Sequence, residues 1–150
     1  MFIYAFKRYG IKFFIIDSLA KCGFGEDDYN GQKGFVDRLM EFSREYNVHV
    51  TMVVHMRKRE DENKIPGKFD IKGTGALSDM VDTAIVWWRN KPKEAASQNG
   101  AVSLQDPDAI LNVVKQRETG FEPMLGLFWH KESCQFLDSP DDEPKQYIFG

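Results

Sequence analysis

The sequence has little of what marks several specialised classes of protein. Its two cysteines, Cys22 and Cys134, have neither metal-ligand spacing nor the pattern of a secreted disulfide framework. No apolar run approaches the roughly 20 residues of a membrane span, and basic residues follow the apolar start instead of preceding it as in a signal peptide. We therefore expect reduced thiols in a cytoplasmic protein that is not secreted and has no membrane partner.

An excess of one charge is also lacking. Twenty Lys and Arg residues stand against 23 Asp and Glu, and the net charge of −3 gives no global sign of nucleic-acid binding, so any basic function must be local. Hydrophobic residues make up 42% of the 150 positions, which is enough for one core. We predict a single domain over residues 1–150, with its core in residues 1–137 and an acidic tail in residues 138–150.

The clearest segment is the apolar run at residues 11–16, which is broken only by Lys12 and ends on Asp17 and Ser18. A continuous apolar run of this length predicts a strand buried on both faces, as in a parallel sheet. An acid at the carboxyl end of such a strand points into the crevice where open α/β sheets bind ligands. The alternative, that Asp17 caps a following helix or turn, is equally compatible with this stretch alone.

The same pattern is repeated further along the chain. Apolar residues at helical spacing predict a helix over about residues 32–47, and a β-branched run predicts a buried strand over residues 48–54 that ends on His55. Because both strands would end at the same edge of a parallel sheet, Asp17 and His55 could meet at one crevice.

The remaining elements follow from local signals. Residues 57–72 are polar and rich in basic side chains, and Gly73-Thr74-Gly75 fits either a phosphate-approaching loop that opens a short helix or a solvated turn. Trp87 and Trp88 point to opposite faces of a strand, so at least one should be buried. We predict a helix at residues 2–9 that ends at Gly10, strands at residues 83–88, 110–114, 125–129 and 134–137, irregular structure at residues 91–108 and a hairpin turn at residues 118–120.

Several polar residues at strand ends or in hairpins suit phosphoryl-transfer chemistry. A strand-end carboxylate such as Asp17 suits Mg²⁺, which prefers oxygen ligands and keeps waters while bridging phosphates. His55 could orient a γ-phosphate, and an arginine on a projecting hairpin could stabilise phosphoryl-transfer charge in its own or a neighbouring subunit. The spacing alone does not single out these roles.

Five segments in the same order resemble the later motifs of DnaB-like replicative helicases, with the closest likeness to the phage and mitochondrial primase-helicase branch. The resemblance covers roughly residues 4–137. The segments are Phe-Phe-Ile-Ile-Asp17-Ser18-Leu19, Met52-Val-Val-His55-Met-Arg57-Lys58, Ile71-Lys72-Gly-Thr-Gly75-Ala-Leu-Ser-Asp79, Val86-Trp-Trp-Arg89-Asn90 and Val114-Lys115-Gln-Arg117.

The resemblance implies an α/β, RecA-like (P-loop NTPase type) three-layer fold, with a mostly parallel sheet and a C-terminal antiparallel meander. It implies an ATPase that uses ATP and Mg²⁺ and assembles as a homo-oligomeric ring, usually a hexamer, on single-stranded DNA during replication in a phage or bacterial context. The site residues it implies are Asp17 as the Walker B acid that holds Mg²⁺ through water, His55 as the sensor, Arg117 as the arginine finger, Lys115 as a second phosphate contact, and Ser18 and Arg89 as further nucleotide-binding residues.

The DNA-binding loops of the family match the segment around residues 57–75. The resemblance assigns the DNA contacts to Arg57, Lys58, Lys72, Gly73 and Gly75. Contacts of this kind go to the phosphate backbone, so they would be independent of base sequence and sensitive to salt.

The chain departs from the family because it contains no Gly-x-x-x-x-Gly-Lys-[Ser/Thr] phosphate loop, and the family's catalytic glutamate would also lie before Met1. It therefore resembles the second half of a RecA-like core, and we expect an upstream P-loop-bearing segment or a neighbouring subunit as partner and no ATP hydrolysis by the chain alone. The absent P-loop strand would leave a gap between the strands at residues 48–54 and 83–88, which we expect to be closed by direct pairing or by another chain. Two alternatives are a non-catalytic domain for single-stranded-DNA binding or assembly, and an unrelated small α/β enzyme that uses Asp17 and His55.

Overall fold

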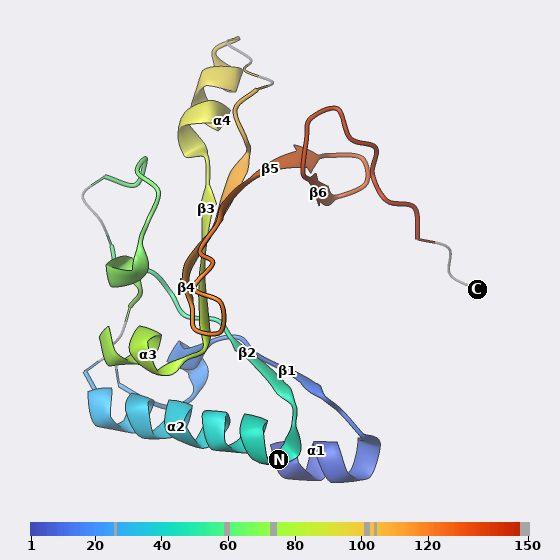
Figure 1. Cartoon of the computed structure of the whole chain (residues 1–150). Helices are drawn as coiled ribbons and strands as arrows, with labels where there is room; N and C mark the ends of the chain where they lie inside the picture. The colour runs from blue at the N-terminus through green and yellow to red at the C-terminus, as the bar shows by residue number, and fades with distance from the viewer. Residues whose placement is uncertain (26, 59–60, 73–74, 101–102, 104, 148–150) are drawn as a thin grey trace. The chain divides into compact units, whose positions relative to one another are not determined.

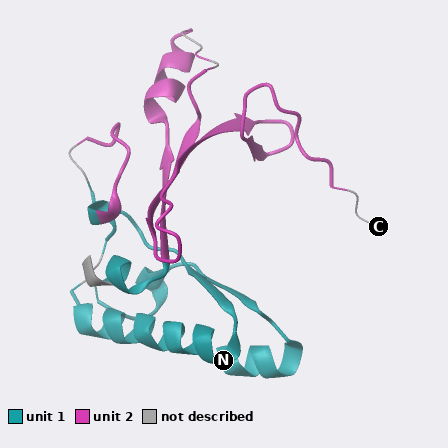
Figure 2. Ribbon diagram, viewed as in Figure 1, with its two compact units in different colours: residues 1–58, 69–82 teal, residues 59–68, 83–150 magenta. Residues whose placement is uncertain are grey.

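The computed structural model describes residues 1–25, 27–58, 61–72, 75–100, 103 and 105–147. The chain divides into two compact units, which Figure 2 distinguishes by colour. The first contains a small parallel sheet with helices, and the second contains an antiparallel sheet. The α/β class is confirmed at this level. The first unit consists of Met1–Lys58 and Phe69–Asp82, and the second of Arg59–Lys68 and Thr83–Gly150.

The first unit is organised on a pair of parallel strands joined by a long crossover helix (Figure 1). That helix begins earlier than predicted because Asp28 caps it, its Oδ1 accepting a hydrogen bond from the Gly31 N–H at 2.9 Å. It ends, as predicted, at Asn47, which has a left-handed backbone. The elements are α1 (Phe2–Tyr9), β1 (Phe13–Ile16), η1 (Leu19–Lys21), α2 (Tyr29–Tyr46), β2 (His49–Met52), η2 (Lys68–Asp70, which begins in the second unit) and α3 (Gly75–Met80).

One face of the parallel pair is covered by aromatic rings from α1 and α2. Phe14 of β1 is buried against Phe42 of α2, with ring centroids 5.3 Å apart, and Phe2 of α1 lies 5.2 Å from Phe14. Tilted and edge-on ring pairs of this kind add to the stability gained by burying apolar area. The predicted helix α1 is confirmed, and it ends at Gly10 with φ 66°.

A second apolar cluster lies beyond the ends of the two strands. Leu19 of η1, Val36 of α2 and Leu77 of α3 are buried together, and Met52 and Val54 pack against them. The cluster holds the segments that follow β1 and β2 against the crossover helix. This packing fixes the positions of the residues that follow the two strands, including those of the candidate site.

The prediction that both faces of these strands are buried is wrong. Phe13 and Ile15 are 77% and 75% exposed, whereas Phe14 between them is 7% exposed. Alternate side chains of a strand point to opposite faces, and α1 and α2 cover only one of them. The other face carries Phe13 and Ile15 of β1 beside the polar His49 and Thr51 of β2, and it is uncovered in the described structure.

Direct pairing across the predicted gap is also not found. In the described residues β2 pairs only with β1, while β3 (Thr83–Arg89) belongs to the antiparallel sheet. His49 and Val53 donate their N–H groups to Lys12 O and Ile16 O at 2.8 and 2.9 Å. Because alternate residues of a parallel ladder bond the same neighbour, Val50 and Met52 direct their backbone groups to the free edge. Closure of this edge by another chain stays a prediction.

The second unit is a meander in which consecutive strands pair in the order β3-β4-β5-β6. The predicted C-terminal antiparallel sheet is confirmed, but it also takes in the strand at residues 83–89, so the sheet content is mostly antiparallel and not mostly parallel. The middle strand β5 pairs with β4 through residues 124–127 and with β6 through residues 128–130. The other strands are β4 (Ala109–Gln116), β5 (Met124–His130) and β6 (Gln135–Leu137).

The prediction of irregular structure for residues 91–108 is wrong at its start, where helix α4 (Lys91–Gln98) forms. The side chain of Asn90 caps this helix by accepting a hydrogen bond from the Lys93 N–H at 3.1 Å. Pro92 lies in the first turn, where a helix does not use the N–H that proline lacks. The proline therefore marks the start of a helix and does not break one.

Candidate functional site

Asp17 and His55 follow two paired strand ends in the first unit. Ile16 and Met52, the last residues of β1 and β2, are directly paired, so the chain leaves the sheet at the same edge from both strands. The Oγ atom of Ser18 lies 3.4 Å from Nε2 of His55. The structure thus brings together the two strand ends that the sequence pattern placed at one crevice.

The two residues at the end of β1 face different surroundings. Asp17 is exposed, whereas Ser18 is buried, and the peptide bond between them is cis. The following 3₁₀ helix η1 begins after Ser18 without a side-chain cap. The N-cap position of η1 is Ser18 and not Asp17, so the alternative that Asp17 caps a following helix is wrong for this helix, and Asp17 is an exposed residue next to Ser18 in the chain.

The metal-binding capacity of this edge rests on Asp17. In the described part of the chain, no three His, Cys, Asp or Glu side chains gather into a group that could hold a metal ion. A single exposed carboxylate fits Mg²⁺, which commonly binds proteins through one or two carboxylates while keeping waters and phosphate oxygens as its other ligands. Asp17 could hold Mg²⁺ in this way only if the other ligands come from water, a nucleotide or another segment.

A hollow of about 140 Å³ opens beside His55. It is smaller than the roughly 300–1,000 Å³ of pockets that hold drug-sized ligands. The hollow therefore admits water or a small ion but not a whole nucleotide. Its lining residues are Leu19, Ala20, Phe24, Gln32, Val54, His55 and Lys72.

The two arms of the predicted DNA-binding segment run side by side next to His55. The N–H of Lys72 donates to His55 O at 2.8 Å, and the N–H of Arg57 donates to Asp70 O at 2.7 Å. These bonds place Arg57 and Lys58 on one arm and Lys72 on the other. Sequence reasoning did not find the backbone link between His55 and Lys72, because no local pattern signals a single bridge between distant residues.

The glycines of this segment are only partly described. Gly75 begins α3, so the predicted short helix is confirmed. Gly73, the other glycine predicted to approach DNA, lies outside the described residues. The DNA contacts of both glycines stay predictions.

The predicted arginine finger belongs to the second unit. Arg117 is exposed at the turn between β4 and β5, where the N–H of Gly120 donates to Gln116 O at 3.1 Å. Gly120 has φ 69°, a left-handed conformation that glycine adopts without steric cost. The hairpin turn is confirmed. Lys115 lies near the end of β4, opposite Ala84 of β3.

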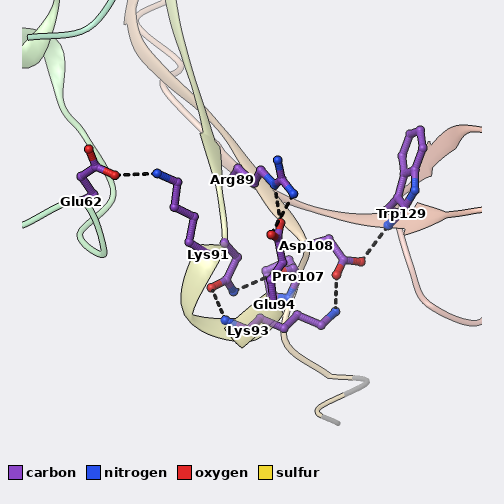
Figure 3. A network of polar contacts seen from close by, with 9 residues as sticks. Glu62, Arg89, Lys91, Lys93, Glu94, Pro107, Asp108 and Trp129 are labelled. Atoms are coloured by element: carbon purple, nitrogen blue, oxygen red, sulfur yellow. Dashed lines mark hydrogen bonds and ion pairs between the residues drawn. The ribbon is translucent and has the colours of Figure 1, made fainter. Parts of the chain in front are cut away.

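Arg89, predicted to bind nucleotide, pairs with a carboxylate in the second unit (Figure 3). Its guanidinium donates two hydrogen bonds to Glu94 of α4, one of them from Nη2 at 2.8 Å. This hydrogen bond and the charge of Glu94 raise the pKa of Arg89 above its usual value. A nucleotide phosphate would have to compete with Glu94 for the guanidinium.

Two more ion pairs surround this position (Figure 3). Nζ of Lys93, a side chain that is only 11% exposed, lies 2.7 Å from Oδ1 of Asp108, whose Oδ2 accepts the Trp129 N–H at 2.8 Å. Lys91 donates a hydrogen bond to Glu62, and this bond together with the charge of Lys91 lowers the pKa of the exposed Glu62 carboxyl. The contacts tie α4 to the strands and to the segment at residues 61–68, which explains them without any ligand.

Comparisons with known proteins do not identify the chain. No family model matches the sequence, and no curated protein matches it. None of the helices in the described ranges combines the length and the apolar character needed to cross a membrane. Any function must therefore be argued from the residues themselves.

Proposed function

We propose that this chain is the second half of the RecA-like ATPase core of a DnaB-like replicative DNA helicase. It would act in ATP-driven DNA unwinding when an upstream segment or a neighbouring subunit supplies the P-loop. The observation that carries the proposal is the pairing of the two strand ends, which places exposed Asp17 beside the Ser18–His55 contact. The order of the five motifs along the sequence supports it further.

In this function Asp17 and Ser18 would occupy the nucleotide side of the strand edge. Asp17 would hold Mg²⁺ through water, and the ion, when bound, would neutralise charge on the β- and γ-phosphates. Because the hollow beside His55 is too small for ATP, the triphosphate must be cradled mainly by the P-loop of the other segment. The chain alone therefore binds no catalytically competent ATP.

His55 would link the nucleotide to DNA through its side chain and its backbone. Its Nε2 lies within reach of Ser18 Oγ, and its backbone oxygen accepts the Lys72 N–H. A γ-phosphate that draws the ring away from Ser18 would also move the backbone that holds Lys72. This couples the state of the nucleotide to the arm predicted to contact the DNA backbone.

The test of the helicase assignment is ATP turnover with and without a P-loop. The purified 150-residue chain should hydrolyse no ATP above the rate of a buffer blank, because it lacks the phosphate-cradling loop and its lysine. The polypeptide extended upstream through its first Gly-x-x-x-x-Gly-Lys-[Ser/Thr] should hydrolyse ATP, faster with single-stranded DNA. Turnover by the 150-residue chain that is lost in Arg117→Ala would contradict the division of the site between two segments.

A second candidate function, single-stranded-DNA binding without catalysis, is favoured by the position of the basic residues. Arg57 and Lys58 lie on one arm of the segment, and Lys72 lies on the other, where its N–H donates to His55 O. Phosphate contacts from these side chains do not need a nucleotide. The extended polypeptide would then bind DNA but show no DNA-stimulated ATP turnover.

Lys72→Ala should weaken binding of a fluorescent thymidine oligonucleotide to the chain. The plot of log K against log salt should become shallower by about 0.7, the value for one phosphate contact to a single strand. Lys33→Ala, which removes an exposed lysine from the outer face of α2, is the matched control and should change little. Equal effects of the two substitutions would mean that the oligonucleotide senses general charge and not this segment.

A further inference from the structure

Three aromatic side chains of the second unit form an uncovered cluster on its sheet. Trp87 of β3, Trp129 of β5 and Phe136 of β6 are 48%, 43% and 40% exposed. The ring of Phe136 lies 4.9 Å from that of Trp87 and 4.8 Å from that of Trp129, measured between centroids. We call these three side chains the aromatic face.

The aromatic face continues into aliphatic side chains on the same side of the sheet. Trp87 lies opposite Leu111, which in turn lies opposite Leu125, and directly opposed residues share a face. Leu125 and Ile85 are themselves exposed. Contiguous exposed apolar surface of this kind marks interaction sites more often than scattered apolar residues do.

The expectation that one of the paired tryptophans is buried is wrong. Trp88, on the opposite face from Trp87, is only half-buried, and its Nε1 donates to Glu62 O at 3.1 Å. Trp87 makes its aromatic contact with Phe136 and remains open to solvent on its other side. Neither tryptophan is therefore fully buried, and the exposure of Trp87 is a property of the face on which it lies.

The chain that follows Phe136 and Leu137 forms a loop whose residues 138–143 carry only acidic charge, with Lys145 at its base. The chain leaves β6 after Leu137 and is tied back to it, because Gln135 Nε2 donates to Lys145 O at 2.9 Å and the Lys145 N–H donates to Gln135 Oε1 at 3.1 Å. Phe136 lies in the three-residue strand from which the loop departs. We call residues 138–143 the acidic loop; its charged residues are Asp138, Asp141, Asp142 and Glu143.

We propose that the aromatic face and the acidic loop together bind a basic segment of a partner protein. Arginine side chains stack on tryptophan rings and also form paired hydrogen bonds with carboxylates, so one arginine-rich segment can satisfy both features. Tryptophan and arginine are also the residues that most often dominate interface energy. The binding surface does not depend on the helicase assignment, because none of its residues takes part in the predicted ATP or DNA site.

The charge of the acidic loop favours a basic peptide over nucleic acid. Surfaces that stack the bases of single strands combine aromatic rings with a positively charged groove for the phosphates. Here every charged residue from Phe136 to Glu143 is acidic, and the guanidinium of Arg89, two residues after Trp87 on β3, is paired with Glu94. A phosphate backbone lying along the aromatic face would be repelled by the loop.

The test uses the full 150-residue chain and fluorescence anisotropy of a labelled peptide that repeats Arg-Pro-Leu. Trp129→Leu should weaken binding about tenfold or more, as removal of a central aromatic does at interfaces. Asp141→Asn with Asp142→Asn should weaken it about threefold or more and make it less sensitive to salt, because two exposed charges are lost. A peptide that repeats Glu-Pro-Leu should not bind.

Two matched variants lie outside the proposed surface. Phe121→Leu removes an exposed aromatic from the β4–β5 connection, and Glu118→Gln removes an acid from the same connection, so both should keep wild-type affinity. If Trp129→Leu unfolds early by circular dichroism, Trp87→Leu replaces it, and the acidic-loop variants leave the sheet untouched. The proposal is overturned if the loop variants and the tryptophan variant bind as wild type, if a thymidine oligonucleotide binds in preference to the basic peptide, or if the face serves only to pair two copies of the chain.

Discussion

Phe14→Ala is expected to lower the free energy of unfolding of the first unit by about 3–5 kcal/mol, the usual cost of deleting a buried ring. The ring is buried between α1 and α2, in contact with Phe2 and Phe42. Its removal leaves a cavity at the point where both helices meet the sheet. Urea denaturation followed by far-ultraviolet circular dichroism measures the loss, because α1 and α2 supply most of the helical signal of this unit.

The matched control is the neighbouring residue. Phe13→Ala makes the same chemical change one position earlier, on the uncovered face, and should shift the unfolding free energy by no more than about 0.5 kcal/mol. All three tryptophans lie in the second unit, so tryptophan emission gives an internal reference in both variants. If Phe13→Ala costs as much as Phe14→Ala, the outer face is covered in solution, and a dependence on protein concentration would identify a second copy as its cover.

The contrast between these two residues shows what the sequence could predict of the fold. Helical spacing located α1 and α2 because one face of each helix must be apolar, and that requirement is local. The run at residues 11–16 is apolar at nearly every position, so its pattern cannot show which face a helix covers. Which side of β1 is buried depends on what packs there, which is decided by segments distant in sequence.

Strand pairing was unpredictable for the same reason. The strand at residues 83–89 contains a continuous apolar run at residues 84–88, as β1 does, and nothing in that run distinguishes a parallel neighbour from the antiparallel one it has in β4. The short hairpin at Gly120 carries real information, because a tight turn forces its two strands to be antiparallel. The polar composition of residues 91–108 indicates irregular structure, whereas helix α4 depends on the cap at Asn90 and on a proline that is tolerated in the first turn.

The candidate site shows a similar division. The two strand ends that precede Asp17 and His55 could be placed at one edge of the sheet from the sequence, because parallel neighbouring strands end on the same side. The bond from the Lys72 N–H to His55 O could not be predicted from the sequence, because every residue type except proline offers the same backbone groups. The Arg89–Glu94 pair could not be predicted either, because its geometry depends on the capped turn that joins β3 to α4.

Arg117→Ala should reduce the ATP turnover of the upstream-extended, P-loop-containing polypeptide about 10³-fold or more, if Arg117 is the arginine finger of the proposed helicase. Its guanidinium would stabilise charge on the transferred phosphoryl group, and its place on an exposed hairpin suits reach toward a neighbouring subunit. Arg117→Lys should recover little, because a lysine lacks the planar fork. Glu118→Ala, one residue along the same turn, should leave turnover within about twofold of wild type.

A mixing experiment separates action in a neighbouring subunit from action within one chain. Asp17→Asn and Arg117→Ala proteins should each be inactive, but equal amounts assembled together should recover measurable turnover. In a ring with head-to-tail contacts, about a quarter of the interfaces would then join an intact Asp17 from one subunit to an intact Arg117 from the next. If both residues served the same subunit, every active site in the mixture would lack one of them and no activity would return. Recovery that scales with the fraction of such interfaces would therefore show that Asp17 and Arg117 complete one site across the boundary between two chains.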